Sequence, residues 1–227
     1  MTGELTVTLI AGGAVVVLWL SGRWLLRALE RHSGADWGGK WLNRLDGLNR
    51  ILCRRFHRLQ HNPLPLPATG GALVVANHLS GLDPLLMVAA SPRPLRFMIA
   101  WDEYERWWLK WLFRAIGCIP VGGPGGHRAA LARATRALLA GEVIALFPQG
   151  GIHLDGPVRL KRGVTLMAEK TGVPIFPLRL DGIGGRGLKV TAVFIRSRAR
   201  ICHFEPLYYR GQHEPFLHEL GRLLSGP

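Results

Sequence analysis

The feature that most constrains the fold is a change of pattern after residue 68, where short apolar runs begin to alternate with helical stretches. The run 143–147 is apolar throughout, which is typical of a strand buried on both faces of its sheet. Alternating strands and helices predict an α/β fold with a mixed, largely parallel sheet covered by helices. The predicted strands are 72–76, 95–100, 116–121, 143–147, 173–180, 188–195 and 199–204, and the predicted helices are 84–90, 128–140, 163–170 and 214–224.

The N-terminal segment predicts a membrane helix that anchors the chain. Residues 5–20 carry no charge, and the uncharged run continues to Gly22, close to the roughly 20 residues that a spanning helix needs. Trp19 and Trp24 stand where aromatic residues meet the membrane interface. A cleaved signal peptide and a buried helix are the alternatives. The start lacks a basic region and Arg23 follows the run directly, which favours a retained anchor.

The charge of the chain favours an anionic surface as partner. It has 29 Lys and Arg against 15 Asp and Glu, a net charge of +14. Between residues 21 and 60 there are nine Lys or Arg and three Asp or Glu, so the positive-inside rule predicts an outer N-terminus, with the rest of the chain in the cytoplasm. A nucleic-acid binder would explain the charge but not the anchor, and no nucleic-acid motif appears, so we expect no nucleic-acid partner.

A second N-terminal segment has the spacing of an amphipathic helix, because its apolar residues recur at steps of three and four. Such a helix lies either among lipid head groups or against the main domain with its arginines in solvent. Prolines at 63, 65 and 67 end it, so we predict an anchor region in residues 1–60 and a folded domain in 61–227. The apolar residues are Trp37, Trp41, Leu45, Leu48, Leu52, Phe56 and Leu59, and the arginines are Arg44, Arg50, Arg54, Arg55 and Arg58.

The three cysteines argue against two classes of small domain. Cys53, Cys118 and Cys202 are odd in number, far apart and in no C-x-x-C pair. This spacing disfavours a disulfide scaffold and a zinc ribbon. We expect neither a metal site nor a resident cofactor.

Candidate catalytic residues stand at the end of the first strand of the folded domain. His78 follows the run 72–76, and Asp83 comes five residues later across a Ser-Gly turn. A histidine with a carboxylate partner is the minimum for general-base catalysis, because the carboxylate fixes the tautomer and stabilises the imidazolium. A structural reading is also open, in which Asp83 before Pro84 caps a helix and His78 satisfies a buried carbonyl.

The sequence blocks around this pair resemble the glycerophospholipid acyltransferase family. The blocks read Asn-His-x-x-x-x-Asp, Gly-x-Ile-Pro-Val, Phe-Pro-x-Gly and Val-Pro-Ile-x-Pro, and they occur in the family's order and spacing over about residues 71–181. The best-known members are the 1-acylglycerol-3-phosphate acyltransferases. The resemblance implies a glycerolipid acyltransferase-like fold. It also implies transfer of a fatty acyl group from acyl-CoA or acyl carrier protein to a lysolipid hydroxyl, most simply that of 1-acylglycerol-3-phosphate.

The same resemblance implies roles for individual residues. His78 would deprotonate the acceptor hydroxyl and Asp83 would orient His78, with no covalent enzyme intermediate. The implied partners are membrane lipids, the acyl donor and the lysolipid acceptor. The residues expected to bind substrate are Asn77, Gly117, Phe147, Pro148, Gln149, Gly150, Lys161, Arg162 and Arg128.

Several positions depart from the family pattern. Gln149 stands where the family usually has a glutamate, and Ile152 stands where it usually has an arginine. Gly123 and Trp101 occupy two further positions where a cation is common. The acceptor phosphate would then need cations from elsewhere, or the acceptor is another lysolipid or lacks a phosphate. A non-catalytic lipid-binding protein is the remaining alternative. The candidate replacement cations are Arg128, Arg159, Lys161 and Arg162.

A tryptophan cluster follows the second strand. Trp107, Trp108 and Trp111 would be neighbours on a helix. They could enter the bilayer beside the active site or pack in the core, and the spacing alone leaves both readings open.

Overall fold

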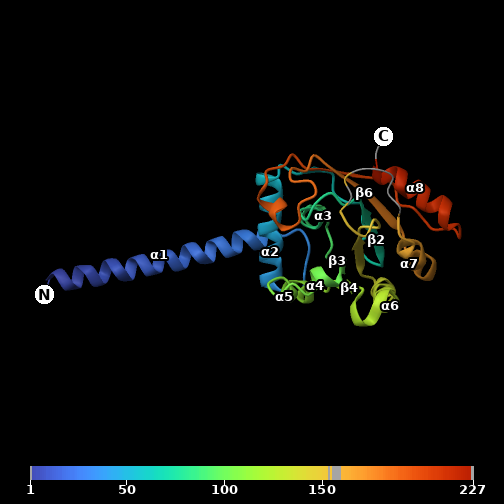
Figure 1. Cartoon of the computed structure of the whole chain (residues 1–227). Coiled ribbons are helices and arrows are strands. Elements are labelled where there is room, and N and C mark those ends of the chain that lie inside the picture. Colours follow the sequence, from blue (N-terminus) through green and yellow to red (C-terminus); the bar gives the residue numbers. More distant parts are fainter. Residues whose placement is uncertain (1, 153, 155–159, 226–227) are drawn as a thin grey trace.

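A computed structural model describes residues 2–152, 154 and 160–225, with the backbone alone for residues 2–15. The chain forms an α/β domain from which one long helix projects (Figure 1). The helices are α1 (Thr2–His32), α2 (Lys40–Ile51), the π-helical turn η1 (Leu52–Phe56), α3 (Asp83–Ala90), α4 (Trp101–Tyr104), α5 (Lys110–Ala115), η2 (Gly123–Gly125), α6 (Gly126–Leu139), α7 (Gly163–Thr171), η3 (Val190–Phe194) and α8 (His213–Ser225). The strands are β1 (Gln60–His61), β2 (Ala72–Ala76), β3 (Leu95–Ala100), β4 (Ile119–Val121), β5 (Val143–Leu146), β6 (Ile175–Asp181) and β7 (Arg200–His203).

The described strands form one mixed sheet in the order β1-β7-β6-β2-β5-β3-β4. The strands from β6 to β4 are all parallel, whereas β7 runs antiparallel to β6 and carries β1 beside it. The largely parallel sheet predicted from the sequence is therefore confirmed. Because the parallel strands share an edge at their carboxyl ends, the residues that follow β2 and β5 come together there.

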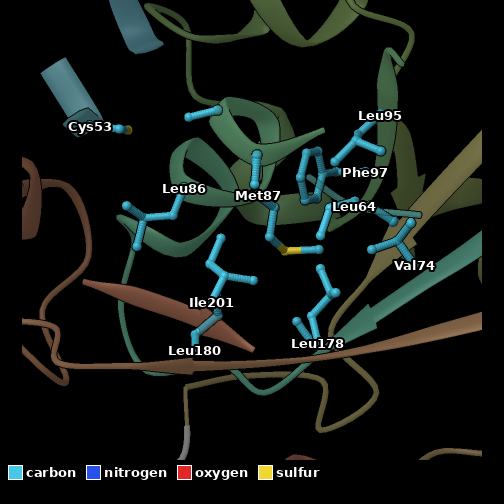
Figure 2. Close-up of a cluster of buried hydrophobic side chains, with 14 of the residues drawn as sticks. Cys53, Leu64, Val74, Leu86, Met87, Leu95, Phe97, Leu178, Leu180 and Ile201 are labelled. Carbon is cyan, nitrogen blue, oxygen red and sulfur yellow. The ribbon is translucent and has the colours of Figure 1, made fainter. Parts of the chain in front are cut away.

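Alternation along the central strand divides the core into two layers. All five residues of β2 are buried. Val74 packs in the cluster beneath α3, where Figure 2 shows Met87 and Leu178 meeting over the sheet. Leu73 and Val75 point to the opposite face, which α6, α7 and α8 cover. The strand end that carries the candidate catalytic residues is thus held rigidly from both sides.

The amphipathic segment packs on the domain as α2 and η1. Asn49 donates its side-chain amide to the Leu85 carbonyl of α3 at 2.9 Å, and Cys53 is fully buried in the core. One arginine expected in the solvated or lipid-facing set, Arg50, is instead buried and ion-paired with Asp46 at 2.8 Å. Burial is possible because carbonyls at the end of α3 accept the remaining guanidinium protons. The boundary at residue 60 stays a prediction.

The predicted membrane span at residues 5–20 falls within α1. Among the described residues, no helix combines the length and the apolar character needed to cross a bilayer. The side chains of residues 2–15, which make up most of the predicted span, lie outside the described part.

Some predicted elements differ from those observed. The strand expected at 188–195 is wrong, since the segment forms the short 3₁₀ helix η3. Neighbouring β6 has β2 on one edge and β7 on the other, so it offers no free edge for this segment. The strand expected at 116–121 begins only at Ile119, because the residues before it complete the turn that follows α5. Two short helices, α4 and α5, were not expected from the sequence.

Candidate active site

Asn77 fixes the chain where β2 ends. Its Oδ1 accepts the Leu180 backbone N–H at 2.7 Å, and its Nδ2 donates to the Leu180 carbonyl at 3.0 Å. The side chain therefore extends the pairing of β2 with β6 by one residue. Asn77 is buried, with both ends of its amide bonded to backbone, which gives it a positioning role. Its predicted contact with substrate stays a prediction.

His78 and Asp83 form a hydrogen-bonded pair at the carboxyl edge of the sheet. His78 Nδ1 lies 2.8 Å from Asp83 Oδ2. Since the ionised carboxylate can only accept, Nδ1 carries the proton and Nε2 holds the lone pair. The His78 side chain is 18% exposed, whereas the Asp83 side chain is fully buried. This arrangement can remove a proton from a bound hydroxyl group.

Asp83 is not the N-cap of α3, because the helix begins at Asp83 itself and its N-cap residue is Leu82. Its Oδ2 also accepts the N–H groups of Leu79 and Ser80, at 2.6 and 2.9 Å, and its Oδ1 accepts the Ser80 hydroxyl at 3.0 Å. These bonds point back into the turn before α3. The carboxylate thus organises the loop that presents His78. The part played by the buried Ser80 was missed, although a serine three residues before an aspartate is a common turn signal.

Phe147 and Gln149 hold His78 from the segment that follows the neighbouring strand, β5. The Phe147 ring stacks on the imidazole with centroids 4.0 Å apart and planes 11° apart. Gln149 Oε1 accepts the backbone N–H of His78 at 2.7 Å, and Gln149 is 8% exposed. We had expected Gln149 to bind the acceptor. Its oxygen bonds to the protein, and a contact of Gln149 with the acceptor stays a prediction.

Lys161 lies beside this turn. Its backbone N–H donates to the carbonyl of Pro148, a buried residue, at 2.8 Å. Gly150 has φ +78°, and a Cβ atom there would lie 2.2 Å from Lys161 Nζ, so the ammonium group lies across the glycine. The positive φ favours glycine here, and a larger residue would push the flexible end of Lys161 aside. The structure therefore brings one exposed cation to the edge of the site.

Three other predicted binding residues, Gly117, Arg128 and Arg162, are not among the described contacts of His78. Gly117 precedes β4 and so lies at the amino edge of the sheet, where the Arg96 guanidinium covers it. Arg128 lies in the first turn of α6, the helix whose Leu131 side chain approaches Gly163 of α7, and its contact with substrate stays a prediction. Arg162 pairs with Glu214 of α8 at 2.6 Å. Arg159, a further candidate cation, lies outside the described residues.

Trp101 and Gly123, the two neutral residues at positions where the family commonly has a cation, lie against one another at the carboxyl edge of the sheet. Trp101 begins α4 after β3, and Gly123 follows β4. A Cβ atom on Gly123 would lie 2.3 Å from the Trp101 ring, so the indole occupies the space over the glycine. An apolar surface stands where we had noted the loss of two cations.

The described cysteines are poorly placed to act as nucleophiles beside His78. Burial raises the pKa of both Cys53 and Cys118 to about 12, so these thiols stay protonated at neutral pH. Cys202 is exposed but lies on β7, two strands from β2. Among the described residues, no three His, Cys, Asp or Glu side chains gather where they could hold a metal ion.

Comparison with known proteins gives related sequences and a related structure. A family model described as "Acyltransferase" matches residues 57–181. The chain is 32% identical over 132 residues to the "Probable 1-acyl-sn-glycerol-3-phosphate acyltransferase" of Mycoplasma pneumoniae, covering 55% of this chain and 49% of that relative. It is 25% identical over 145 residues to the "1-acyl-sn-glycerol-3-phosphate acyltransferase" of Borreliella burgdorferi, covering 63% of this chain and 58% of the relative. The chain thus spans only about half the length of these relatives.

A solved structure shares the fold. It is the crystal structure of "the 1-acyl-sn-glycerophosphate (LPA) acyltransferase, PlsC, from Thermotoga maritima", with a TM-score of 0.63. The alignment covers 82% of this chain and 78% of that chain at 20% identity. At this identity the likeness concerns the fold alone.

Proposed function

Since this chain belongs to the acyltransferase family, we propose that it transfers a fatty acyl group from a thioester, acyl-CoA or acyl-acyl carrier protein, to the hydroxyl of a lysophospholipid. The most favoured acceptor is 1-acylglycerol-3-phosphate, the substrate named for its relatives. The observation that carries the proposal is the hydrogen-bonded pair of His78 and the buried Asp83 at the carboxyl edge of the sheet.

In the proposed reaction, His78 Nε2 takes the proton of the acceptor hydroxyl as its oxygen attacks the thioester carbonyl. Asp83 stabilises the imidazolium that forms and keeps the ring in place. The tetrahedral intermediate then expels the thiolate, which receives the proton from His78. An ester bond forms, a thioester bond breaks, and the enzyme returns to its starting state. No residue becomes acylated.

Lys161 is the residue we propose for the acceptor phosphate. Its ammonium lies across Gly150, two residues after Pro148 in the turn that follows β5. A charge-assisted bond to a phosphate oxygen would be available there. The Trp101 ring over Gly123 supports a second candidate, an acceptor with a neutral head group.

We further propose that the enzyme works at a membrane surface, where its lipid acceptor resides. The described part of α1 exposes apolar side chains, among them Leu18 at 72% and Trp24 at 66%. Trp107, before α5, is 87% exposed. The ring centroids of Trp111 and of Trp41 in α2 lie 5.5 Å apart. The tryptophan cluster is thus largely exposed. The side of the membrane stays a prediction.

The experiment that tests the reaction incubates the purified full chain with labelled acyl-CoA and a panel of acceptors. The panel holds lysophosphatidic acid, lysophosphatidylcholine and monoacylglycerol in matched vesicles. We expect His78→Ala to lose about 10²–10⁴-fold in kcat, the range for removal of a general base, and Asp83→Asn to lose most activity. We expect Lys161→Ala to raise KM for lysophosphatidic acid much more than for monoacylglycerol.

The matched control is Lys170→Ala, which removes an exposed cation from α7. It should behave as wild type with every acceptor. Full turnover by folded His78→Ala protein would refute the general-base mechanism. Equal effects of Lys161→Ala on both acceptors would remove the phosphate role of Lys161 and favour the neutral head group.

A further inference from the structure

Five exposed arginines gather on a surface separate from the candidate active site, which we call the arginine face. It combines η1, the turn after it and the segment leading into β7. Figure 1 shows the cyan end of α2 and the orange chain before β7 side by side. Its members are Arg54, Arg58, Arg196, Arg198 and Arg200.

The backbone explains why these side chains share one face. Arg196, Arg198 and Arg200 alternate with the buried residues Ser197 and Ala199, as the two-residue period of an extended chain requires. The Ala199 N–H donates to the His57 carbonyl at 3.0 Å, and the Gln60 N–H donates to the Ala199 carbonyl at 2.9 Å. These bonds pin the turn that carries Arg58 against the segment that carries Arg198.

Two hollows open on this face. One, of about 570 Å³, is lined by Arg58, Arg196 and Arg198 together with residues 182–184. The other, of about 690 Å³, has Arg54 and Arg200 in its wall. Both hollows are shallow and open to solvent, so a phosphate group could lie at the surface against the arginines.

The charge of this face is not neutralised by the protein. Within residues 2–152, 154 and 160–225, no carboxylate is ion-paired with any of the five arginines. The nearest carboxylate by strand pairing, Asp181 opposite Arg200, lies 3.1 Å from Arg179. Arg58 also adopts φ +49°, a conformation that favours glycine or asparagine.

Apolar side chains next to the arginines indicate the kind of partner. Phe194, two residues before Arg196, is 77% exposed. Phe56, between Arg54 and Arg58, is 37% exposed. A soluble anion would need only the cations, whereas a lipid surface presents phosphates at the level of the head groups and apolar chains just beneath.

We infer that the arginine face docks on an anionic membrane, with lipid phosphates in its two hollows and Phe194 in the acyl-chain boundary. This contact goes beyond the transfer reaction and is distinct from the exposed apolar stretch of α1. It supplies sensitivity to lipid charge, whereas α1 supplies affinity that does not depend on charge.

The test measures binding of the full chain to sedimenting vesicles of phosphatidylcholine alone and with added phosphatidylglycerol. Wild-type protein should bind the anionic vesicles far more tightly, and less so as salt is raised. In the triple variant Arg58→Gln, Arg196→Gln, Arg198→Gln this preference should fall by roughly a hundredfold, the effect of three cations at a charged surface. Binding to neutral vesicles should stay as in wild type.

The matched control replaces three exposed cations on α6 and α7, as Arg133→Gln, Arg136→Gln, Lys170→Gln. This control variant changes the net charge by the same amount and should keep most of the preference for anionic over neutral vesicles. Circular dichroism checks that both variants are folded. Equal losses in the two variants would overturn the proposal, since net charge alone would then explain the preference. An unchanged preference in the first variant, with a raised KM for acyl-CoA, would also overturn it and assign the face to the phosphates of the donor.

Discussion

At the scale of single residues, Gln149 determines how His78 is presented. Its Oε1 holds the His78 backbone N–H, while the Phe147 ring two residues earlier stacks on the imidazole. Both contacts come from the segment after β5, so the His78 side chain and backbone are held from beside the next strand as well as by Asp83. A neutral amide fills this role without placing a second carboxylate beside the pair.

We predict that two changes at Gln149 affect different kinetic quantities: Gln149→Ala lowers kcat, and Gln149→Glu shifts the pH profile. Gln149→Ala leaves the His78 N–H without its acceptor, a loss of about 1–3 kcal/mol for a buried group, and should lower kcat by roughly 10–100-fold. Gln149→Glu keeps an acceptor but adds negative charge, which stabilises the protonated imidazole. The acid limb of kcat/KM should therefore move to higher pH. Steady-state kinetics across pH 5–9 checks both.

Gln212→Glu is the matched control, because it adds the same charge at an exposed position before α8. Its pH profile should overlay that of wild type. A Gln149→Ala enzyme with unchanged kcat and an unchanged profile would show that the bond to His78 has no part in positioning the base.

At the scale of elements, α3 is held at both ends. Asp83 at its start organises the turn that carries His78, and Arg50 of α2 donates to the carbonyls of Val88, Ala89 and Ser91 at its other end. Asp46 completes the arrangement by accepting from Arg50 and from the Gly34 N–H after α1. The N-terminal helices are thereby connected to the helix that supports the active site.

We predict that Arg50→Met destabilises the fold by about 3–5 kcal/mol, because it leaves the buried Asp46 carboxylate uncompensated. The double variant Asp46→Asn, Arg50→Met should recover part of this loss. Urea unfolding followed by circular dichroism gives both free energies. Arg54→Met, one helical turn later and exposed, should change stability by no more than about 0.5 kcal/mol. An Arg50→Met effect as small as that of Arg54→Met would mean that the buried pair contributes little.

The sequence predicted the long elements and the pairing of His78 with Asp83, but not the contacts of individual polar residues. Apolar runs such as 143–147 have a clear period, and the acyltransferase family is confirmed by the match over residues 57–181. Arg50 and Gln149 both looked like solvent- or substrate-facing groups, because burial of a polar side chain depends on partners distant in the sequence. Arg50 bonds to Ala89, and Gln149 bonds to His78. The strand expected at 188–195 does not form, because strand pairing also depends on parts of the chain distant in the sequence, here on which edges of the sheet are free.

At the scale of the whole molecule, the stability of the fold should depend on His57. This residue is fully buried, and its two ring nitrogens have no hydrogen-bond partner among the described residues. Burial outweighs the nearby Val193 backbone and lowers the pKa of His57 below its usual 6.5. As the pH falls below that value, the unfolded chain takes up the proton first, so the free energy of unfolding decreases.

We predict that acidification from pH 7.5 to 5 lowers the Tm of wild-type protein more than that of His57→Phe, which cannot take up this proton. Thermal unfolding followed by circular dichroism at each pH provides the comparison. His218→Phe, at an exposed position on α8, should keep the pH dependence of wild type. If the wild-type and His57→Phe curves ran parallel, protonation of His57 would have no place in acid unfolding.

The distribution of the three thiols has a practical consequence for the whole molecule. Cys53 and Cys118 are buried and protonated, whereas Cys202 is exposed in the wall of the same hollow as Arg54 and Arg200. A maleimide dye added to the folded, unmodified chain should therefore attach at one position. An environment-sensitive fluorophore at Cys202 would then report, through its emission colour, when the arginine face leaves water, without any engineered cysteine.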